Sequence, residues 1–298
     1  MNQKVVPHLW FDTEAQEAAE FYTDIFPNSR ILSRSTISDT PSGDAGQVVF
    51  EILGYRFMAI SAGPYFTKNP AISFLIPFRS EEKDLIDEIW SKLLDGGKAL
   101  MDLGDYPFSS KYGWVEDKYN VSWQLYLVDD KETFPPSTVV PTLTFTNDVV
   151  GKAEEAAKLY TELFNSTNSL DMYYYPEGME PNLTSHVMNG HFLLDAERFV
   201  VQDSAISHEF NFNEGISLMV NCEDQDEIDH FWNVLSAVPE SEQCGWLKDQ
   251  YGVSWQIVPK RMDEMLENGS EEQIKRVTEA FLKMKKFDLA ELEKAYKG

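Results

Sequence analysis

The sequence predicts an α+β protein made of two tandem copies of one domain, followed by a C-terminal helical tail. Three observations predict this fold class: a repeat with an offset of 132 residues, the same order of strands and helix in each copy, and a change of pattern after Pro259. With 298 residues, the chain is long for one domain and sufficient for two that each bury a core.

The repeat is clearest in two aromatic segments. YGWVEDKYNVSWQLYL at 112–127 and CGWLKDQYGVSWQIVP at 244–259 share eight of sixteen residues. Upstream, VPHLWF and AAEFYTDIF return in the same order as VPTLTF and AAKLYTELF. Because several separate segments recur in one order, the whole domain is duplicated.

Each copy contains two similar units. VPHLWF predicts a strand, and residues 14–26 carry apolar side chains at helical spacing. Strand-like runs follow at 29–38, 46–53 and 56–61, which gives the order βαβββ. The same order recurs from Ile72, so the chain is predicted to hold four βαβββ units. The first copy also carries an extra segment of ten residues, about 101–111, which we expect to form a loop.

The proline-rich segment FPPSTVVP at 134–141 predicts the linker between the copies. The expected domains are therefore residues 1–135 and 136–260, with the tail at 261–298. In this tail, Ser270 and Gln273 have the spacing of a capping box that opens a helix.

Composition excludes several classes of protein. Fifty acidic and 25 basic residues give a net charge of −25, which repels nucleic acid and anionic lipid. No apolar run is long enough to span a membrane, and the N-terminal segment lacks the apolar stretch of a signal peptide. With only two cysteines as well, we expect a cytoplasmic protein without nucleic-acid or membrane partners.

The paired units, the ending D-x-Y-G-V-S-W-Q-I-V-P and the tail RVTEAFLKMKKFDLAELEKA resemble the PhnB-like family of the vicinal oxygen chelate superfamily. This superfamily includes glyoxalase I, bleomycin-resistance and fosfomycin-resistance proteins, and extradiol dioxygenases. The resemblance covers nearly the whole chain, and the first copy departs from the pattern at Asn120, where the family has glycine. Members are often labelled 3-demethylubiquinone methyltransferases, yet the sequence has no glycine-rich strand–turn–helix to seat S-adenosylmethionine.

The resemblance implies glyoxalase-like domains, in each of which two βαβββ units form an incomplete barrel around a cavity. Such domains commonly pair, so the two copies are expected to form an internal pseudo-dimer. A further homo-oligomer stays open, and the repeat alone would equally suit two independent domains.

Active members of the superfamily bind a divalent metal through His and Glu side chains on the first and last strands of the units. In this chain, strand alternation turns His8 and Trp10 toward the cavity. Gln124 and Ser73 stand where the superfamily usually has glutamate and often histidine, and the second copy has Thr142, Ser217 and Gln256. Since these donors are nearly all neutral, we predict no tight metal and no cofactor.

The predicted ligand-binding residues share inward-facing strand positions: His8, Trp10, Ser73, Gln124, Tyr126, Thr142, Ser217 and Gln256. Two of these residue types also have structural interpretations. His8 could be a half-buried histidine bonded to a backbone carbonyl, and the two glutamines could tie the barrel edge to a backbone group. Trp123 and Trp255 are expected in the core.

Three functions fit these observations. The first is a protein that binds a small organic molecule without a tight metal. The second is a metal-dependent lyase, isomerase or dioxygenase that combines His8 with carboxylates such as Glu51, Asp102 or Asp105. The third is a structural or regulatory partner protein. The sequence predicts no catalytic residue.

Overall fold

The computed structural model describes residues 3–40, 43–128, 139–166 and 170–298. The first unit contains β1 (Val5–Phe11), α1 (Ala15–Ile25), β2 (Arg30–Thr40), β3 (Gly43–Ile52) and β4 (Tyr55–Ser61). The second contains β5 (Ile72–Phe78), α2 (Lys83–Leu94), β6 (Lys98–Tyr106), β7 (Ser109–Glu116) and β8 (Ser122–Leu127). The third contains β9 (Val140–Thr146), α3 (Ala153–Leu163), β10 (Asp171–Tyr174), β11 (Val187–Leu194) and β12 (Glu197–Ser204). The fourth contains β13 (Ile216–Cys222), α4 (Gln225–Leu235), β14 (Trp246–Lys248) and β15 (Ser254–Pro259), and the tail contains α5 (Lys260–Asn268), α6 (Glu271–Phe281) and α7 (Leu289–Lys297).

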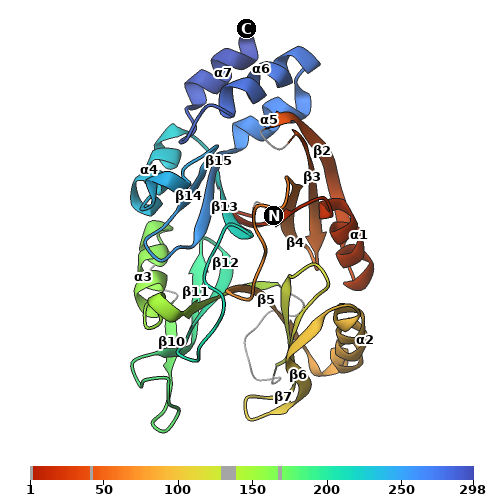
Figure 1. Cartoon of the computed structure of the whole chain (residues 1–298), viewed down its shortest axis with the longest axis vertical. Helices are drawn as coiled ribbons and strands as arrows, with labels where there is room; N and C mark the ends of the chain where they lie inside the picture. The colour runs from red at the N-terminus through yellow and green to blue at the C-terminus, as the bar shows by residue number, and fades with distance from the viewer. Residues whose placement is uncertain (1–2, 41–42, 129–138, 167–169) are drawn as a thin grey trace.

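The strands form two sheets, and each sheet takes one unit from each copy (Figure 1). The seven-stranded sheet has the order β14-β15-β13-β1-β4-β3-β2, and the eight-stranded sheet has the order β10-β11-β12-β9-β5-β8-β7-β6. Antiparallel pairs join the copies, with His8 opposite Ser217 and Ser73 opposite Thr142. The tandem glyoxalase-like fold is therefore confirmed and the copies do pair. The structure differs from the expectation in one respect, because the two units that share a sheet come from different copies.

Helices α1 to α4 lie on the outside of the two sheets (Figure 1). The side chains between helix and sheet form one large core, in which Trp123 lies 5.2 Å from Tyr22 and 5.4 Å from Phe74 between ring centroids. The expected core positions of Trp123 and Trp255 are confirmed, since both are fully buried. We call the opposite face of each sheet, which is turned away from these helices, its inner face.

Two buried carboxylates hold the core tryptophans. Asp117 accepts a hydrogen bond from the indole N–H of Trp123 at 2.8 Å, and Asp249 accepts one from Trp255 at 2.9 Å. Each also accepts two backbone N–H groups of its own loop. Burial raises the pKa of both carboxyls to about 6, and these hydrogen bonds oppose the shift.

The extra segment of the first copy is not a loop. It forms most of β6 and the start of β7, which pair as an antiparallel hairpin with irregular register. In the second copy, the fourth unit has only two strands after its helix, β14 and β15. The predicted domain boundary near residues 135 and 136 lies outside the described residues.

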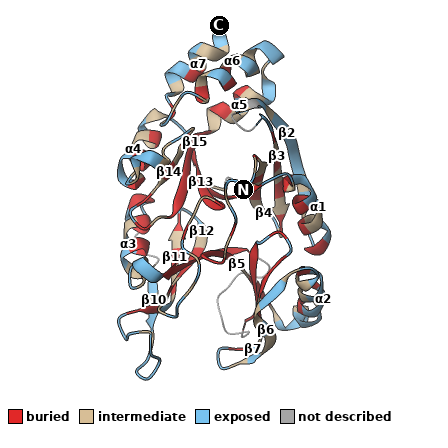
Figure 2. Ribbon diagram, in the orientation of Figure 1, coloured by how far each residue is buried: buried red, intermediate tan, exposed pale blue. Residues whose placement is uncertain are grey.

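The tail closes one end of the seven-stranded sheet (Figures 1 and 2). The predicted capping box is confirmed at α6, where Ser270 accepts from the backbone N–H of Gln273. A second apolar cluster joins Met262, Met265, Val277 and Phe281 to Val6, Met219 and Val258 of the inner face. No helix within the described ranges is long and apolar enough to cross a membrane.

Candidate functional site

The predicted ligand-binding residues divide between the two sheets. His8, Trp10, Ser217 and Gln256 lie on the inner face of the seven-stranded sheet, and Ser73, Gln124, Tyr126 and Thr142 lie on that of the eight-stranded sheet. The cross-copy pairing produces this division, because His8 of the first copy meets Ser217 of the second. Each inner face therefore has half of the predicted set.

A serine–glutamine pair is repeated at the centre of both inner faces. The amide nitrogen of Gln256 donates to the hydroxyl of Ser217 at 2.9 Å, and that of Gln124 donates to Ser73 at 2.8 Å. In the first copy, Tyr112 also donates its hydroxyl to the Gln124 oxygen, at 2.8 Å, whereas Cys244 has the matching position in the second copy. Within the described ranges, the glutamines thus bond to neighbouring side chains and not to the backbone group that one interpretation proposed.

His8 is buried among the neutral groups of the seven-stranded sheet. Its side chain is 2 % exposed, and its ring lies edge-on to Trp246 with 5.4 Å between centroids. Burial lowers the pKa of His8 to about 3, so the imidazole is neutral at physiological pH. Its Nδ1 atom has no hydrogen-bond partner in the described part of the chain.

Aromatic side chains gather around Trp10 and Trp246 beside His8, and they are half-exposed except for Tyr65, which is 64% exposed. Trp10 lies 6.0 Å from Trp246, 5.1 Å from Phe66 and 6.5 Å from Tyr65, measured between ring centroids. The indole N–H of Trp10 donates to the carbonyl of Gly63 at 2.7 Å, which fixes its orientation. Tyr126, by contrast, is on the other sheet. The arrangement has a buried polar floor and an aromatic rim, as small-molecule sites commonly do.

The residues at the expected metal positions do not suit a tight divalent cation. In the seven-stranded sheet, His8 is opposite Ser217 on one neighbouring strand and Met58 on the other, and Gln256 is bonded to Ser217. This set has one imidazole and no carboxylate. In the eight-stranded sheet, the matching residues are Thr142, Val200, Ser73 and Gln124.

None of the carboxylates considered as additional ligands is on a strand next to His8, since Glu51 is on β3, which β4 separates from β1. Glu51 forms an ion pair with Arg30 at 3.1 Å. Asp102 and Asp105 belong to β6, on the sheet that does not contain His8. Over the described ranges, no group of three or more His, Cys, Asp or Glu side chains is arranged to hold a metal.

Sequence analysis missed two inner-face residues of β4, Arg56 and Met58. In β4, whose sequence is YRFMAIS, Tyr55, Phe57 and Ala59 are buried and the residues between them, which face inward, are half-buried. The arginine recurs at the start of β12 as Arg198, in the segment ERFVVQDS. This repeat of an arginine at the same inward-facing strand position could have been found by aligning the two copies.

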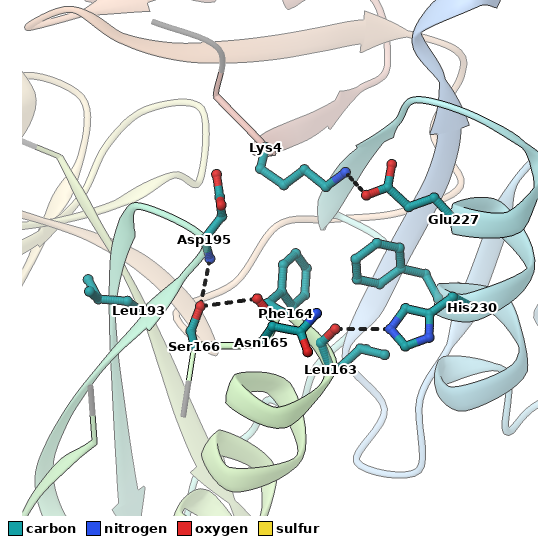
Figure 3. Close-up of a pocket in the computed structure, with 10 residues that line it drawn as sticks. Lys4, Leu163, Phe164, Asn165, Ser166, Leu193, Asp195, Glu227 and His230 are labelled. Atoms are coloured by element: carbon teal, nitrogen blue, oxygen red, sulfur yellow. Dashed lines mark hydrogen bonds and ion pairs between the residues drawn. The ribbon is translucent and has the colours of Figure 1, made fainter. Parts of the chain in front are cut away.

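Two hollows of the surface lie away from the predicted residues. One, of about 610 Å³, lies between α3, α4 and the β11–β12 turn and is lined by Lys4, Phe164, Asp195, Glu227 and His230 among others (Figure 3). Lys4 forms an ion pair with Glu227 at 2.5 Å there, and His230 contacts the carbonyl of Leu163 at 3.0 Å. The other hollow, of about 310 Å³, is lined by polar residues of α1, β2 and β3. No predicted ligand-binding residue lines either one.

Comparisons with known proteins agree with this fold. The family model described as 3-demethylubiquinone-9 3-methyltransferase matches residues 3–126 and again residues 137–258. A protein from Bacillus cereus, described as a putative 3-demethylubiquinone-9 3-methyltransferase and PhnB protein, is 39% identical over 42% of this chain and 100% of its own length, with a TM-score of 0.39. A comparison with curated proteins finds no match.

Two more distant structures share the tandem fold over most of the chain. Glyoxalase I from Zea mays is 12% identical, covers 86% of this chain and 93% of its own, and has a TM-score of 0.52. A putative dioxygenase from Bacillus subtilis is 9% identical, covers 85% of this chain and 83% of its own, and has a TM-score of 0.51. Because the family model matches both copies, the chain belongs to the PhnB-like family, which that model describes as 3-demethylubiquinone-9 3-methyltransferase.

Proposed function

We propose that the protein binds a small, partly aromatic organic molecule on the inner face of the seven-stranded sheet, without a tight metal ion. One observation carries the proposal. Neutral hydrogen-bonding groups of His8, Ser217 and Gln256 form a buried floor beside the half-exposed rings of Trp10 and Trp246. An unpaired imidazole nitrogen and an aromatic rim together favour a ligand with one polar group and one flat apolar part.

The family description does not lead to a methyl-transfer mechanism here. S-adenosylmethionine is commonly held where a glycine-rich turn joins a strand to a helix. The four turns that lead from a strand into α1, α2, α3 and α4 contain one glycine in all, Gly151. The residues present therefore do not fit that cofactor, and we derive no step through it.

The test is a binding screen with variants matched between the copies. Saturation-transfer NMR against small aromatic compounds should identify compounds that bind. The affinity of the protein for them should fall at least about tenfold with Trp246→Ala and with His8→Leu. The control is Thr142→Val, because Thr142 occupies the position of His8 in the eight-stranded sheet. Binding that weakens only with Thr142→Val would place the ligand on the other sheet and contradict the proposal.

Elemental analysis separates this function from a metal-dependent enzyme. Protein purified without chelators or added metal should contain well under one equivalent of zinc, manganese or iron per chain. One tight equivalent that disappears in His8→Ala would instead support metal-dependent catalysis. Failure of every aromatic compound to bind the unmodified protein would remove the ligand-binding proposal itself.

A further inference from the structure

Arg56 lies on the same inner face as the proposed ligand site. It precedes Met58 by two residues on β4, and Met58 is the cross-strand neighbour of His8. With a rise of about 3.3 Å per residue and about 4.8 Å between strands, the Cα atoms of Arg56 and His8 are separated by roughly 8 Å. The long side chain of arginine can cover this distance, so one small ligand can contact both residues.

The guanidinium of Arg56 has no bonded partner in the described chain. Its Nε atom is buried without a hydrogen bond, and among the described residues no ion pair joins the side chain to a carboxylate, since Glu51, directly opposite on β3, is paired with Arg30. The other cations of this face are paired, Arg30 with Glu51 at 3.1 Å and Lys248 with Glu214 at 2.8 Å. A half-buried, unpaired guanidinium is the group that would gain most from an incoming anion.

Asp263 of α5 interacts electrostatically with Arg56 without forming an ion pair with it. Burial, and the nearby charges of Glu267 and Glu264, raise the pKa of Asp263 to about 6, whereas Arg56 acts in the opposite direction. Asp263 therefore neutralises Arg56 only in part. It also makes this end of the site unfavourable for a ligand with two negative charges.

We propose that Arg56 binds the carboxylate of a small monocarboxylic acid whose aromatic or aliphatic part lies toward Met58 and Trp10. This inference rests on the proposed ligand-binding function and names its substrate class. The planar guanidinium matches a carboxylate with two parallel hydrogen bonds. A single negative charge also suits a protein of net charge −25 better than the double charge of a phosphate ester.

The second copy offers an internal comparison. Arg198 occupies the position of Arg56 at the start of β12, on the inner face of the eight-stranded sheet. There its charge contributes to the lowered pKa of His191, after the larger effect of burial. Because Arg198 is on the other sheet, its replacement is a matched control for the loss of one inward-facing arginine.

The experiment compares 4-hydroxyphenylacetate with its neutral amide, 4-hydroxyphenylacetamide, by isothermal titration calorimetry. The two probes have the same ring and hydroxyl, and only the acid offers a carboxylate to Arg56. The unmodified protein should bind the acid at least about tenfold more tightly than the amide. Arg56→Gln should reduce this ratio to about one and leave the affinity for the amide unchanged. Arg198→Gln should keep the ratio, and Asp263→Asn should raise it.

Each other outcome overturns the inference. Equal affinities of the unmodified protein for acid and amide, or a preference that survives in Arg56→Gln, would show that Arg56 is not the anchor. A preference lost only in Arg198→Gln would assign it to the other sheet. If the amide binds and responds to Trp246→Ala while the carboxylate has no effect, the proposed function stands and the anchor fails. If neither probe binds, this ligand class is wrong, and the wider aromatic screen decides the proposed function separately.

Discussion

The replacement Asp249→Asn tests the network that holds the core of the second copy. One carboxylate oxygen of Asp249 accepts the backbone N–H groups of Tyr251 and Val253, at 2.9 and 3.0 Å. The other accepts the hydroxyl of Tyr160 at 2.6 Å and the indole N–H of Trp255 at 2.9 Å. Asparagine has one oxygen, which the two backbone donors retain. Its NH₂ group then faces the indole N–H, and two donors meet with no acceptor between them.

The size of the effect follows from that mismatch. Losing a hydrogen bond to a charged acceptor and leaving a buried donor unsatisfied should lower the free energy of unfolding by about 2 to 3 kcal/mol at pH 7. Trp255→Phe removes the indole donor, so Asp249→Asn should cost at least about 1 kcal/mol less in that background. Asp117→Asn should show a similar cost in the first copy, since Asp117 holds Trp123 in the same way.

The pH dependence has a definite sign. Burial raises the pKa of Asp249 to about 6 in the folded protein, above the value of about 3.8 in an unfolded chain. The folded state therefore binds the proton more tightly, and the stability contributed by this group is greatest below pH 3.8 and is lost as pH rises through 6. Asparagine does not titrate in this range. The cost of Asp249→Asn should thus grow by about 1 kcal/mol between pH 7 and pH 5.

Urea unfolding followed by fluorescence and circular dichroism measures these costs. Asp229→Asn is the control, because it removes a surface carboxylate that pairs with Lys286 and should change stability by less than about 0.5 kcal/mol. An Asp249→Asn cost as small as that of the control would refute the network. So would a cost that Trp255→Phe does not reduce, because the indole N–H would then not depend on the carboxylate.

Three further predictions follow from buried groups. Met265→Ala should lower the unfolding free energy by about 2 to 4 kcal/mol in the same urea assay, because Met265 is 1 % exposed between the tail and the inner face. A cost below about 1 kcal/mol would contradict that packing. Gly113→Ala should cost about 1 to 3 kcal/mol, since the added Cβ would lie 2.5 Å from the Trp90 ring; a neutral result would mean that the ring moves aside freely. His8 should stay neutral from pH 8 to pH 5 in an NMR titration, because burial lowers its pKa to about 3. Its contribution to stability is therefore lost only as pH falls below about 6.5, the pKa of histidine in an unfolded chain. A titration midpoint near 6.5 would contradict the burial of the imidazole.

Local patterns in the sequence predicted most of the fold. The repeat gave the four units, and strand alternation separated His8 and Trp10 from Leu9 and Phe11, which are in the core. The sequence predicts a loop for the extra segment at 101–111, because the segment has no counterpart in the second copy. It is a hairpin because β6 pairs with β7 along its length, and no periodicity of the segment itself shows a long-range pairing of this kind.

The pairing between copies could not be predicted from the sequence. The first strand of each copy has the same alternation, so β1 could pair equally well with strands of its own copy or with β13. The unpaired state of Arg56 was hidden for a similar reason. Glu51 faces Arg56 across the β3–β4 hairpin but is paired with Arg30, and Asp263 comes from α5, whose distance to β4 depends on how the tail packs.

The cross-copy pairing determines how the two inner faces can differ. Each face uses the first-strand residue of one copy and the serine–glutamine pair of the other, as His8 does with Ser217 and Gln256. A change in one copy therefore affects one half of both faces. The tail breaks the remaining symmetry, because it packs on Val6, Met219 and Val258 of the seven-stranded sheet only. His8, Trp246 and the unpaired Arg56 all lie on that same sheet, so the face that the tail closes is also the one with the groups suited to a ligand.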